Sequence, residues 1–80
     1  MATARWHLTY SEELVSEPLL WELATQHGLV TNVRRANVED TLGWVIVEVH
    51  GEPAALREGR EFLTGRGVAV ADLGGDVVAG

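Results

Sequence analysis

The feature that most constrains the fold is the segment from Leu29 to Val49, LVTNVRRANVEDTLGWVIVEV. It contains two runs rich in valine and isoleucine, residues 29–38 and 44–49, separated by the polar break Glu39-Asp40-Thr41-Leu42-Gly43. β-Branched residues favour extended strands, and short polar residues with glycine favour turns. The segment therefore predicts a β-hairpin at the centre of a small sheet.

Residues 4–10, ARWHLTY, predict a further strand that precedes the hairpin. Their side chains alternate, because Trp6, Leu8 and Tyr10 fall on one face and the more polar Arg5, His7 and Thr9 on the other. This period of two is typical of a strand with one face buried.

The segment between this strand and the hairpin predicts a helix. Pro18 suits the first helical position, where its missing N–H costs nothing, with Ser16 or Glu17 as the N-cap. Gly28 suits a left-handed C-cap. Between these ends an apolar stripe recurs at helical spacing: Leu19, Leu20, Leu23 and Ala24.

A second helix follows the hairpin, with Pro53 at its first position and Gly65-Arg66-Gly67 at its end. Its inner face is expected to carry Ala55, Leu56, Gly59, Phe62 and Leu63. Residues 68–72 then predict a short last strand. We expect residues 1–3 and 74–80 to be flexible or peripheral.

The element order β-α-β-β-α-β predicts an α+β ferredoxin-like sandwich. We expect a four-stranded antiparallel sheet in the order 4-1-3-2 with both helices on one face. The strand at 29–38 then lies at an edge of the sheet. Residues 1–80 form a single domain in this prediction, as the length of 80 residues suggests.

Composition excludes several classes of function. The chain has no cysteine, which excludes disulfides, thiolate zinc sites and directly bound iron–sulfur clusters, so we expect no cofactor. The net charge of −6 argues against nucleic acid as a partner. No signal peptide is evident, and no apolar run approaches the roughly 20 residues needed to span a membrane. We expect a cytoplasmic protein without membrane insertion.

No group of residues predicts catalysis or metal binding. His7, His27 and His50 are far apart, with no carboxylate at ligand spacing, and the serines and threonines have no partner base. We expect that the protein is not an enzyme and holds no metal. His7 is the histidine most worth attention, because the alternation places it on the uncovered sheet face beside Glu48.

The hairpin is expected to have two faces with different roles. Val45, Val47 and Val49 should face the helices, and Trp44, Ile46 and Glu48 the uncovered side, next to Arg5, His7 and Thr9. Exposed Trp and Ile side chains usually mark a contact surface, which favours a homodimer, and the alternative is that the C-terminal tail covers them.

Arg34 and Arg35 are neighbours on a strand, so we expect them to point to opposite faces. In an acidic domain they favour a small anionic ligand or an acidic partner surface.

The hairpin and the segments after it resemble the NIL domain family, from Arg5 to Leu73. The family's Asn-Ile-Leu stretch corresponds to Asn32, Val33 and Arg34. A glycine at the end of the next strand corresponds to Gly51, and the family's Leu-x-x-x-Gly-Val pattern corresponds to residues 63–68.

The resemblance implies a regulatory domain of the kind found on methionine-importer ATPases and fused to ferredoxins, which pairs and binds the amino acid at the interface. For this chain it implies a stand-alone sensor of methionine or a related sulfur-containing amino acid. The alternative is an adaptor for a protein partner such as a sulfur-metabolism or ferredoxin-type enzyme, with no small ligand. Arg34 departs from the apolar residue of the family pattern and would suit a ligand carboxylate instead. The expected ligand- or partner-binding residues are His7, Asn32, Arg34, Trp44 and Ile46.

Overall fold

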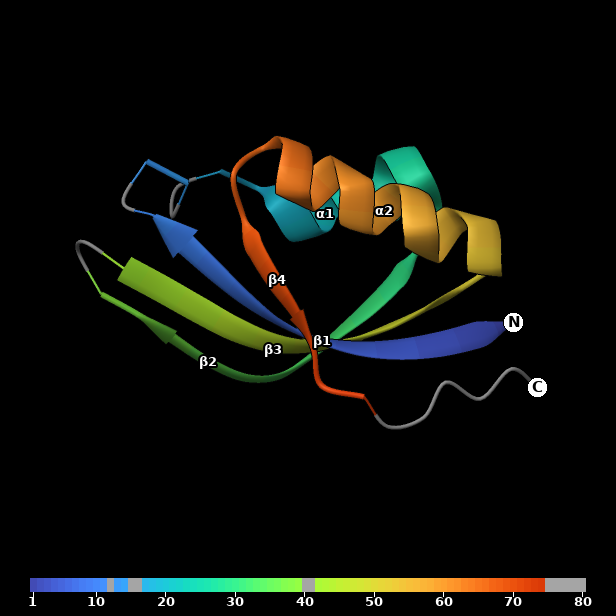
Figure 1. Ribbon diagram of the computed structural model, residues 1–80, viewed down its shortest axis with the longest axis horizontal. Coiled ribbons are helices and arrows are strands. Elements are labelled where there is room, and N and C mark those ends of the chain that lie inside the picture. The colour runs from blue at the N-terminus through green and yellow to red at the C-terminus, as the bar shows by residue number, and fades with distance from the viewer. Residues whose placement is uncertain (12, 15–16, 40–41, 75–80) are drawn as a thin grey trace.

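The computed structural model describes residues 1–11, 13–14, 17–39 and 42–74. The elements follow the predicted order β-α-β-β-α-β (Figure 1). In sequence they are β1 (Ala2–Ser11), α1 (Leu19–His27), β2 (Val30–Val38), β3 (Leu42–Gly51), α2 (Pro53–Gly65) and β4 (Ala69–Asp72).

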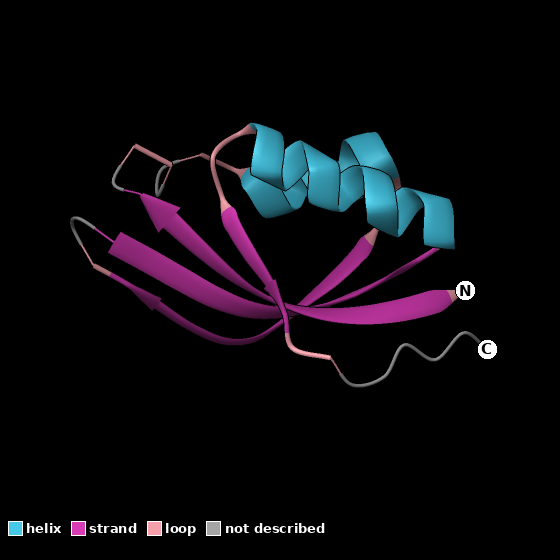
Figure 2. Ribbon diagram, in the orientation of Figure 1, coloured by secondary structure: helices cyan, strands magenta, loops and turns pink. Residues whose placement is uncertain are grey.

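The strands form one antiparallel sheet of four strands in the order β2-β3-β1-β4. Central strands β1 and β3 pair over their whole lengths, with Trp6 opposite Val47 and Leu8 opposite Val45. Both helices pack on the same side of the sheet and leave the other side uncovered (Figure 2). The predicted ferredoxin-like architecture, strand order and edge position of β2 are therefore confirmed.

The hydrophobic core lies between the sheet and the helices. Leu8, Leu23, Val47, Val49 and Leu63 have no exposed surface, and Trp6 is 2% exposed. The alternation of β1 and β3 explains this, because Trp6 and Leu8 of β1 and Val45, Val47 and Val49 of β3 fall on the helical side. The predicted inner face of the sheet is confirmed.

Leu29, just before β2, is buried between two glycines of different elements. A Cβ atom on Gly51 of β3 would lie 2.5 Å from Leu29 Cδ2, and one on Gly59 of α2 would lie 2.6 Å from Leu29 Cδ1. Glycine is required at both places for close packing rather than for backbone geometry. This contact sets how closely α2 approaches the sheet.

The helix ends follow the predictions at three of four places. Gly28 caps α1 in the left-handed conformation, at φ 66° and ψ 28°, and its N–H bonds to the carbonyl of Leu23. Pro53 occupies the first turn of α2, and that helix ends at Gly65.

The predicted start of α1 is wrong by one residue. Pro18 is the N-cap rather than the first helical residue, and no side chain caps the helix. Of the two expected caps, Ser16 lies outside the described residues, and Glu17 is directed to an ion pair with Arg66 instead.

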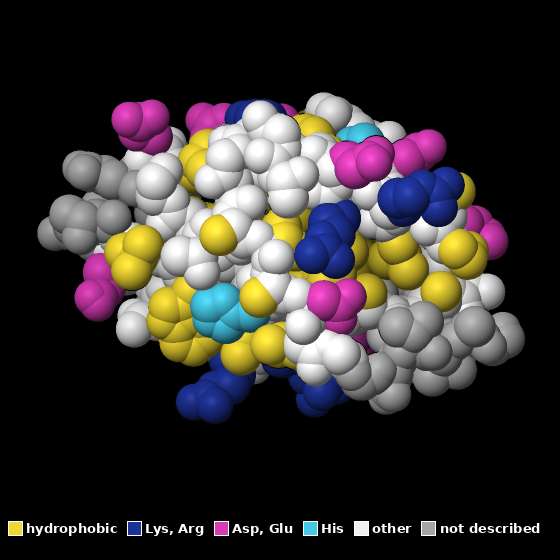
Figure 3. Space-filling model, in the orientation of Figure 1, with side chains coloured by type: hydrophobic (Ala, Val, Ile, Leu, Met, Phe, Trp, Pro, Cys, Tyr) yellow, Lys and Arg dark blue, Asp and Glu magenta, His cyan; other side chains and the backbone are white. Residues whose placement is uncertain are grey.

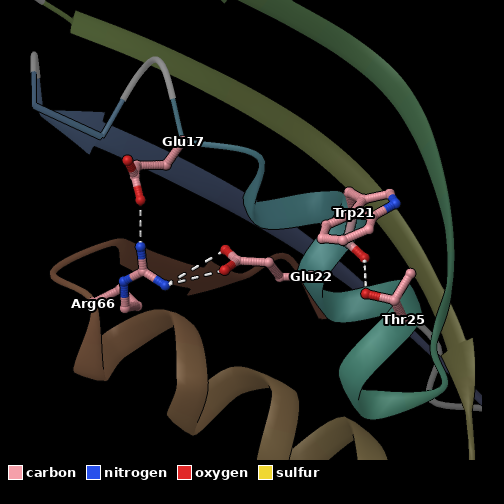
Figure 4. A network of polar contacts seen from close by, with 5 residues as sticks. All are labelled: Glu17, Trp21, Glu22, Thr25 and Arg66. Atoms are coloured by element: carbon pink, nitrogen blue, oxygen red, sulfur yellow. Dashed lines mark hydrogen bonds and ion pairs between the residues drawn. The ribbon is translucent and has the colours of Figure 1, made fainter.

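Arg66 links the chain before α1 to the end of α2 (Figure 4). Its guanidinium bonds to the carboxylates of Glu17 and Glu22, with Nη1 3.4 Å from Glu22 Oε2. The same guanidinium lies 5.6 Å above the centroid of the Phe62 ring. Only about a third of the Arg66 side chain is exposed (34%), so these contacts are partly shielded from solvent.

The two ends of the chain differ in what the structure describes. Ala2 and Thr3, expected to be frayed, continue β1 and pair with Gly51 and His50, because β3 extends far enough to meet them. At the other end Leu73 donates its N–H to the carbonyl of Arg5 at 2.9 Å, and residues 75–80 lie outside the described part. No described helix has the length and apolar character required to cross a membrane.

Candidate functional site

The candidate site is the sheet side opposite the helices, which we call the open face. The period of two along β1 and β3 places there every side chain that the sequence predicts, together with Thr3 and His50 at the ends of the two strands. They are Thr3, Arg5, His7 and Thr9 from β1 and Trp44, Ile46, Glu48 and His50 from β3.

His7 and Trp44 stack on each other in the open face. Their ring centroids are 5.3 Å apart and their planes differ by 17°. Trp44 and its neighbour Ile46 are half-buried, so they are less exposed than the fully displayed patch that the sequence suggested. His7 lies opposite Ile46, and Glu48 lies one pair further along the ladder, opposite Arg5.

Glu48 has two basic neighbours from the central strands. Arg5 Nη2 lies 2.8 Å from Glu48 Oε2, and His50 Nε2 lies 3.4 Å from Oε1. The hydrogen bond from Arg5 is the largest cause that lowers the pKa of the Glu48 carboxyl, against an opposing effect of desolvation. The charges of Arg34, Arg5 and His50 lower this pKa further, so Glu48 is an anion held within a basic environment.

A β-bulge in β2 changes the placement of the arginine pair. Val33 lies opposite Val47, but the next paired residues are Arg35 and Ile46, so Arg34 is the extra residue. The prediction that Arg34 and Arg35 point to opposite faces is therefore wrong. Both line the same hollow on the open face.

This hollow, which we call the arginine hollow, has a volume of about 270 Å³ and is open to solvent. It is lined by Arg5, Arg34, Arg35, Ile46 and Leu73, which come from β1, β2, β3 and the segment after β4. Figure 3 shows basic side chains projecting on the side away from the helices, next to hydrophobic side chains.

The arginine hollow concentrates positive charge in an acidic protein. Three of the six basic residues line it, although the chain carries twelve acidic ones. Arg5 is paired with Glu48, whereas neither Arg34 nor Arg35 forms an ion pair with any carboxylate in the described part of the chain. Among the described residues, the hollow therefore carries two guanidinium groups without a carboxylate partner.

The structure brings most of the predicted site residues together. Arg34 and Ile46 line the arginine hollow, and His7 and Trp44 form the stack beside it. Asn32 is exposed on β2 opposite Glu48, outside the lining of the hollow.

Three lining residues, Arg5, Arg35 and Leu73, were not among the predicted ones. The alternation of β1 already indicated Arg5. The bulge that places Arg35 on the open face has no sequence signal here, since no glycine marks it. The position of Leu73 in the lining depends on the path that the chain takes after β4.

Other features of the described surface offer fewer groups that could bind a ligand. No cluster of three or more histidine, aspartate or glutamate side chains is arranged to hold a metal ion in this part of the chain. Trp21 on α1 is 63% exposed, and three valines of the edge strand β2, Val30, Val33 and Val38, are also exposed. None of these four residues was among the predicted binding residues.

Comparison with known proteins identifies the family. No curated protein matches the sequence. The fold is similar to the crystal structure of the C-terminal domain of an ABC transporter ATP-binding protein from Enterococcus faecalis. That similarity has a TM-score of 0.78 at 14% identity, and it covers 91% of this chain and 86% of the other. The NIL domain model matches residues 4–71, which is most of the sequence. The chain therefore belongs to the NIL domain family.

Proposed function

We propose that this protein is a regulatory module that pairs with a second copy and binds a small amino acid, methionine or a related one, on its open face. The observation that carries the proposal is membership of the NIL family over residues 4–71. The similar fold of an ABC transporter ATP-binding protein's C-terminal domain is consistent with a role in controlling a transport ATPase.

The chemistry of the open face suits such a ligand. The half-exposed side chains of Trp44 and Ile46 offer an apolar surface, and a methionine thioether packs favourably against aromatic rings. Arg34, freed from the strand register by the bulge, offers a guanidinium to the ligand carboxylate. The carboxylate contact at Arg34 replaces an apolar contact of the family pattern.

Thermal unfolding with increasing methionine tests the ligand. A ligand that binds only the native state raises stability with concentration, by about 2.7 kcal/mol at one hundred times its Kd. We expect the melting temperature to rise with methionine and much less with alanine, which lacks the thioether chain. An unchanged melting temperature at millimolar methionine, in protein that is folded by circular dichroism, would rule methionine out.

Light scattering tests the pairing. We expect a dimer, and we expect Trp44→Ala to shift it towards monomer because the aromatic ring contributes much of the apolar area of the open face. Trp21→Ala is the matched control, since Trp21 lies on α1 away from that face. A monomer in both the wild-type protein and the Trp44 variant would remove the pairing from the proposal.

A second candidate function is a protein adaptor without a small ligand. The 63% exposed Trp21 favours it, because tryptophan is enriched at the centres of protein interfaces. Binding to a purified transport ATPase would then be lost in Trp21→Ala and retained in Trp44→Ala. Loss in the Trp44 variant alone would favour the open face instead.

A further inference from the structure

We propose that the arginine hollow is a binding site for a short-chain dicarboxylate, a small organic molecule with two carboxylates at its ends. This inference goes beyond the proposed function and does not depend on methionine. A zwitterionic amino acid has one carboxylate and can pair with one arginine of the hollow, whereas a dicarboxylate can pair with both Arg34 and Arg35.

The first support is charge. Arg34 and Arg35 have no carboxylate partner in the described residues. The third arginine of the lining, Arg5, is paired with Glu48. After Glu48 neutralises Arg5, the charge at the hollow is about two positive units, which a dianion matches. Arginine binds carboxylates through two parallel hydrogen bonds, so two free guanidinium groups can each take one carboxylate.

The second support is geometry. In a regular strand Arg34 and Arg35 would lie on opposite faces, and only the bulge directs both to one hollow. Bulges often redirect a side chain at functional sites. The arrangement therefore gives a paired cationic site that neighbouring residues on a strand do not normally form.

The third support is the apolar part of the lining. Ile46 and Leu73 contribute hydrocarbon surface between and beside the guanidinium groups, and Leu73 is held there by its hydrogen bond to the Arg5 carbonyl. The hollow, with a volume of about 270 Å³, accommodates a five-carbon dicarboxylate with room for bound water beside it. Inorganic phosphate would leave the apolar lining unused.

A second copy of the chain does not itself supply the anion that the arginine hollow lacks. Pairing of two open faces would add the positive charges of both hollows to one interface, and like charges at an interface are unfavourable. A bound dianion removes that repulsion, so dicarboxylate binding and pairing of the chain would support each other.

Calorimetric titration at low salt tests the proposal, with glutarate as the dicarboxylate, butyrate as the monocarboxylate of similar length and inorganic phosphate as a compact anion. We expect glutarate to bind at least about tenfold more tightly than butyrate or phosphate. Loss of one charged hydrogen-bonded contact should weaken binding by about tenfold or more, so Arg34→Gln and Arg35→Gln should each do so. Glu48→Gln should strengthen binding, because it removes the competing carboxylate.

Arg57→Gln is the matched control. It makes the same change in net charge on the exposed side of α2, and it should change the affinity for glutarate by less than about twofold. If a glutamine variant is not folded by circular dichroism, Arg34→Lys serves instead, because it keeps the charge and loses the paired hydrogen bonds.

Four results would overturn the proposal. They are equal affinity for glutarate and butyrate, phosphate binding as tightly as glutarate, the same loss in Arg57→Gln as in Arg34→Gln, and no heat with any of the three anions. Methionine is titrated separately. Glutarate binding without methionine binding would count against the proposed amino-acid ligand alone, and the reverse result would count against this inference alone.

Discussion

Among single residues, Gly59 of α2 packs tightly against Leu29, which immediately precedes β2. A methyl group at position 59 would lie 2.6 Å from Leu29 Cδ1 and 3.2 Å from Leu23 Cδ2, and both leucines are buried. Overpacking costs about 1–3 kcal/mol, more than the roughly 1 kcal/mol by which alanine exceeds glycine in a helix. We therefore expect Gly59→Ala to lower the free energy of unfolding by about 1 kcal/mol, measured by urea denaturation.

Gly65 in the same helix provides the control, because nothing lies within 4 Å of a Cβ at that position. Gly65→Ala should leave stability unchanged or raise it by less than about 1 kcal/mol. Equal effects of the two substitutions would show that helix propensity, rather than the contact with Leu29, determines the result.

Glu48 gives a pH dependence of known sign. Its pKa is lowered from the usual 4.5, first by the hydrogen bond from Arg5, so the native state favours the ionised form. Its contribution to stability is present above pH 4.5 and is lost as the pH falls through the lower native pKa. We expect Glu48→Gln to lose less stability than the wild-type protein on acidification from neutral pH, measured by urea midpoints along a pH series.

Arg5→Gln should also reduce the loss of stability on acidification, because the Arg5 guanidinium is the main cause of the lowered pKa of Glu48. If both variants keep the wild-type slope, other carboxylates determine the acid sensitivity.

Between elements, Arg66 is the polar link that joins the chain before α1 to the end of α2. Exposed ion pairs contribute about 0.2–1 kcal/mol and a cation over an aromatic ring about 0.5–1 kcal/mol. We expect Arg66→Gln to cost about 1–2 kcal/mol in thermal or urea unfolding, with Arg57→Gln nearly neutral. A double-mutant cycle with Glu22→Gln should give a coupling energy of up to about 1 kcal/mol, and no coupling would assign the loss to the contacts of Arg66 with Glu17 and Phe62.

The bulge in β2 is the element that decides the chemistry of the open face. One extra residue between Val33 and Arg35 leaves the remaining pairs of β2 and β3 intact and moves Arg34 out of the ladder. An edge strand can hold such an irregularity because it has only one neighbour, and a bulge also discourages unwanted strand pairing at that edge.

For the whole molecule, the excess of acidic residues predicts a salt response. A net charge of −6 on 80 residues repels itself in the compact state, and added salt screens this repulsion. We expect moderate NaCl concentrations to raise the melting temperature while they weaken anion binding in the arginine hollow. Glu58→Gln with Glu61→Gln, two exposed substitutions on α2, should reduce the salt response. A melting temperature that falls with salt would mean that the local ion pairs outweigh the net charge.

The sequence alone determined the architecture, because periodicity and turn residues are local signals that agree with one another. The alternation of β1 and β3, the helical stripes, the cap at Gly28 and the proline at Pro53 each specify one element. Few arrangements of β-α-β-β-α-β satisfy right-handed crossovers, so the strand order followed.

Only the tertiary structure decided how the open face is built. The stack of His7 on Trp44 depends on the rotation of two side chains from different strands. The joint placement of Arg34 and Arg35 depends on a bulge that no local pattern marks, and the position of Leu73 on a hydrogen bond to Arg5. Alternation assumes a regular ladder, so a single extra residue reverses its prediction for every side chain beyond it. That is why the sequence pointed to the hairpin as the candidate site but assigned its two arginines to opposite sides.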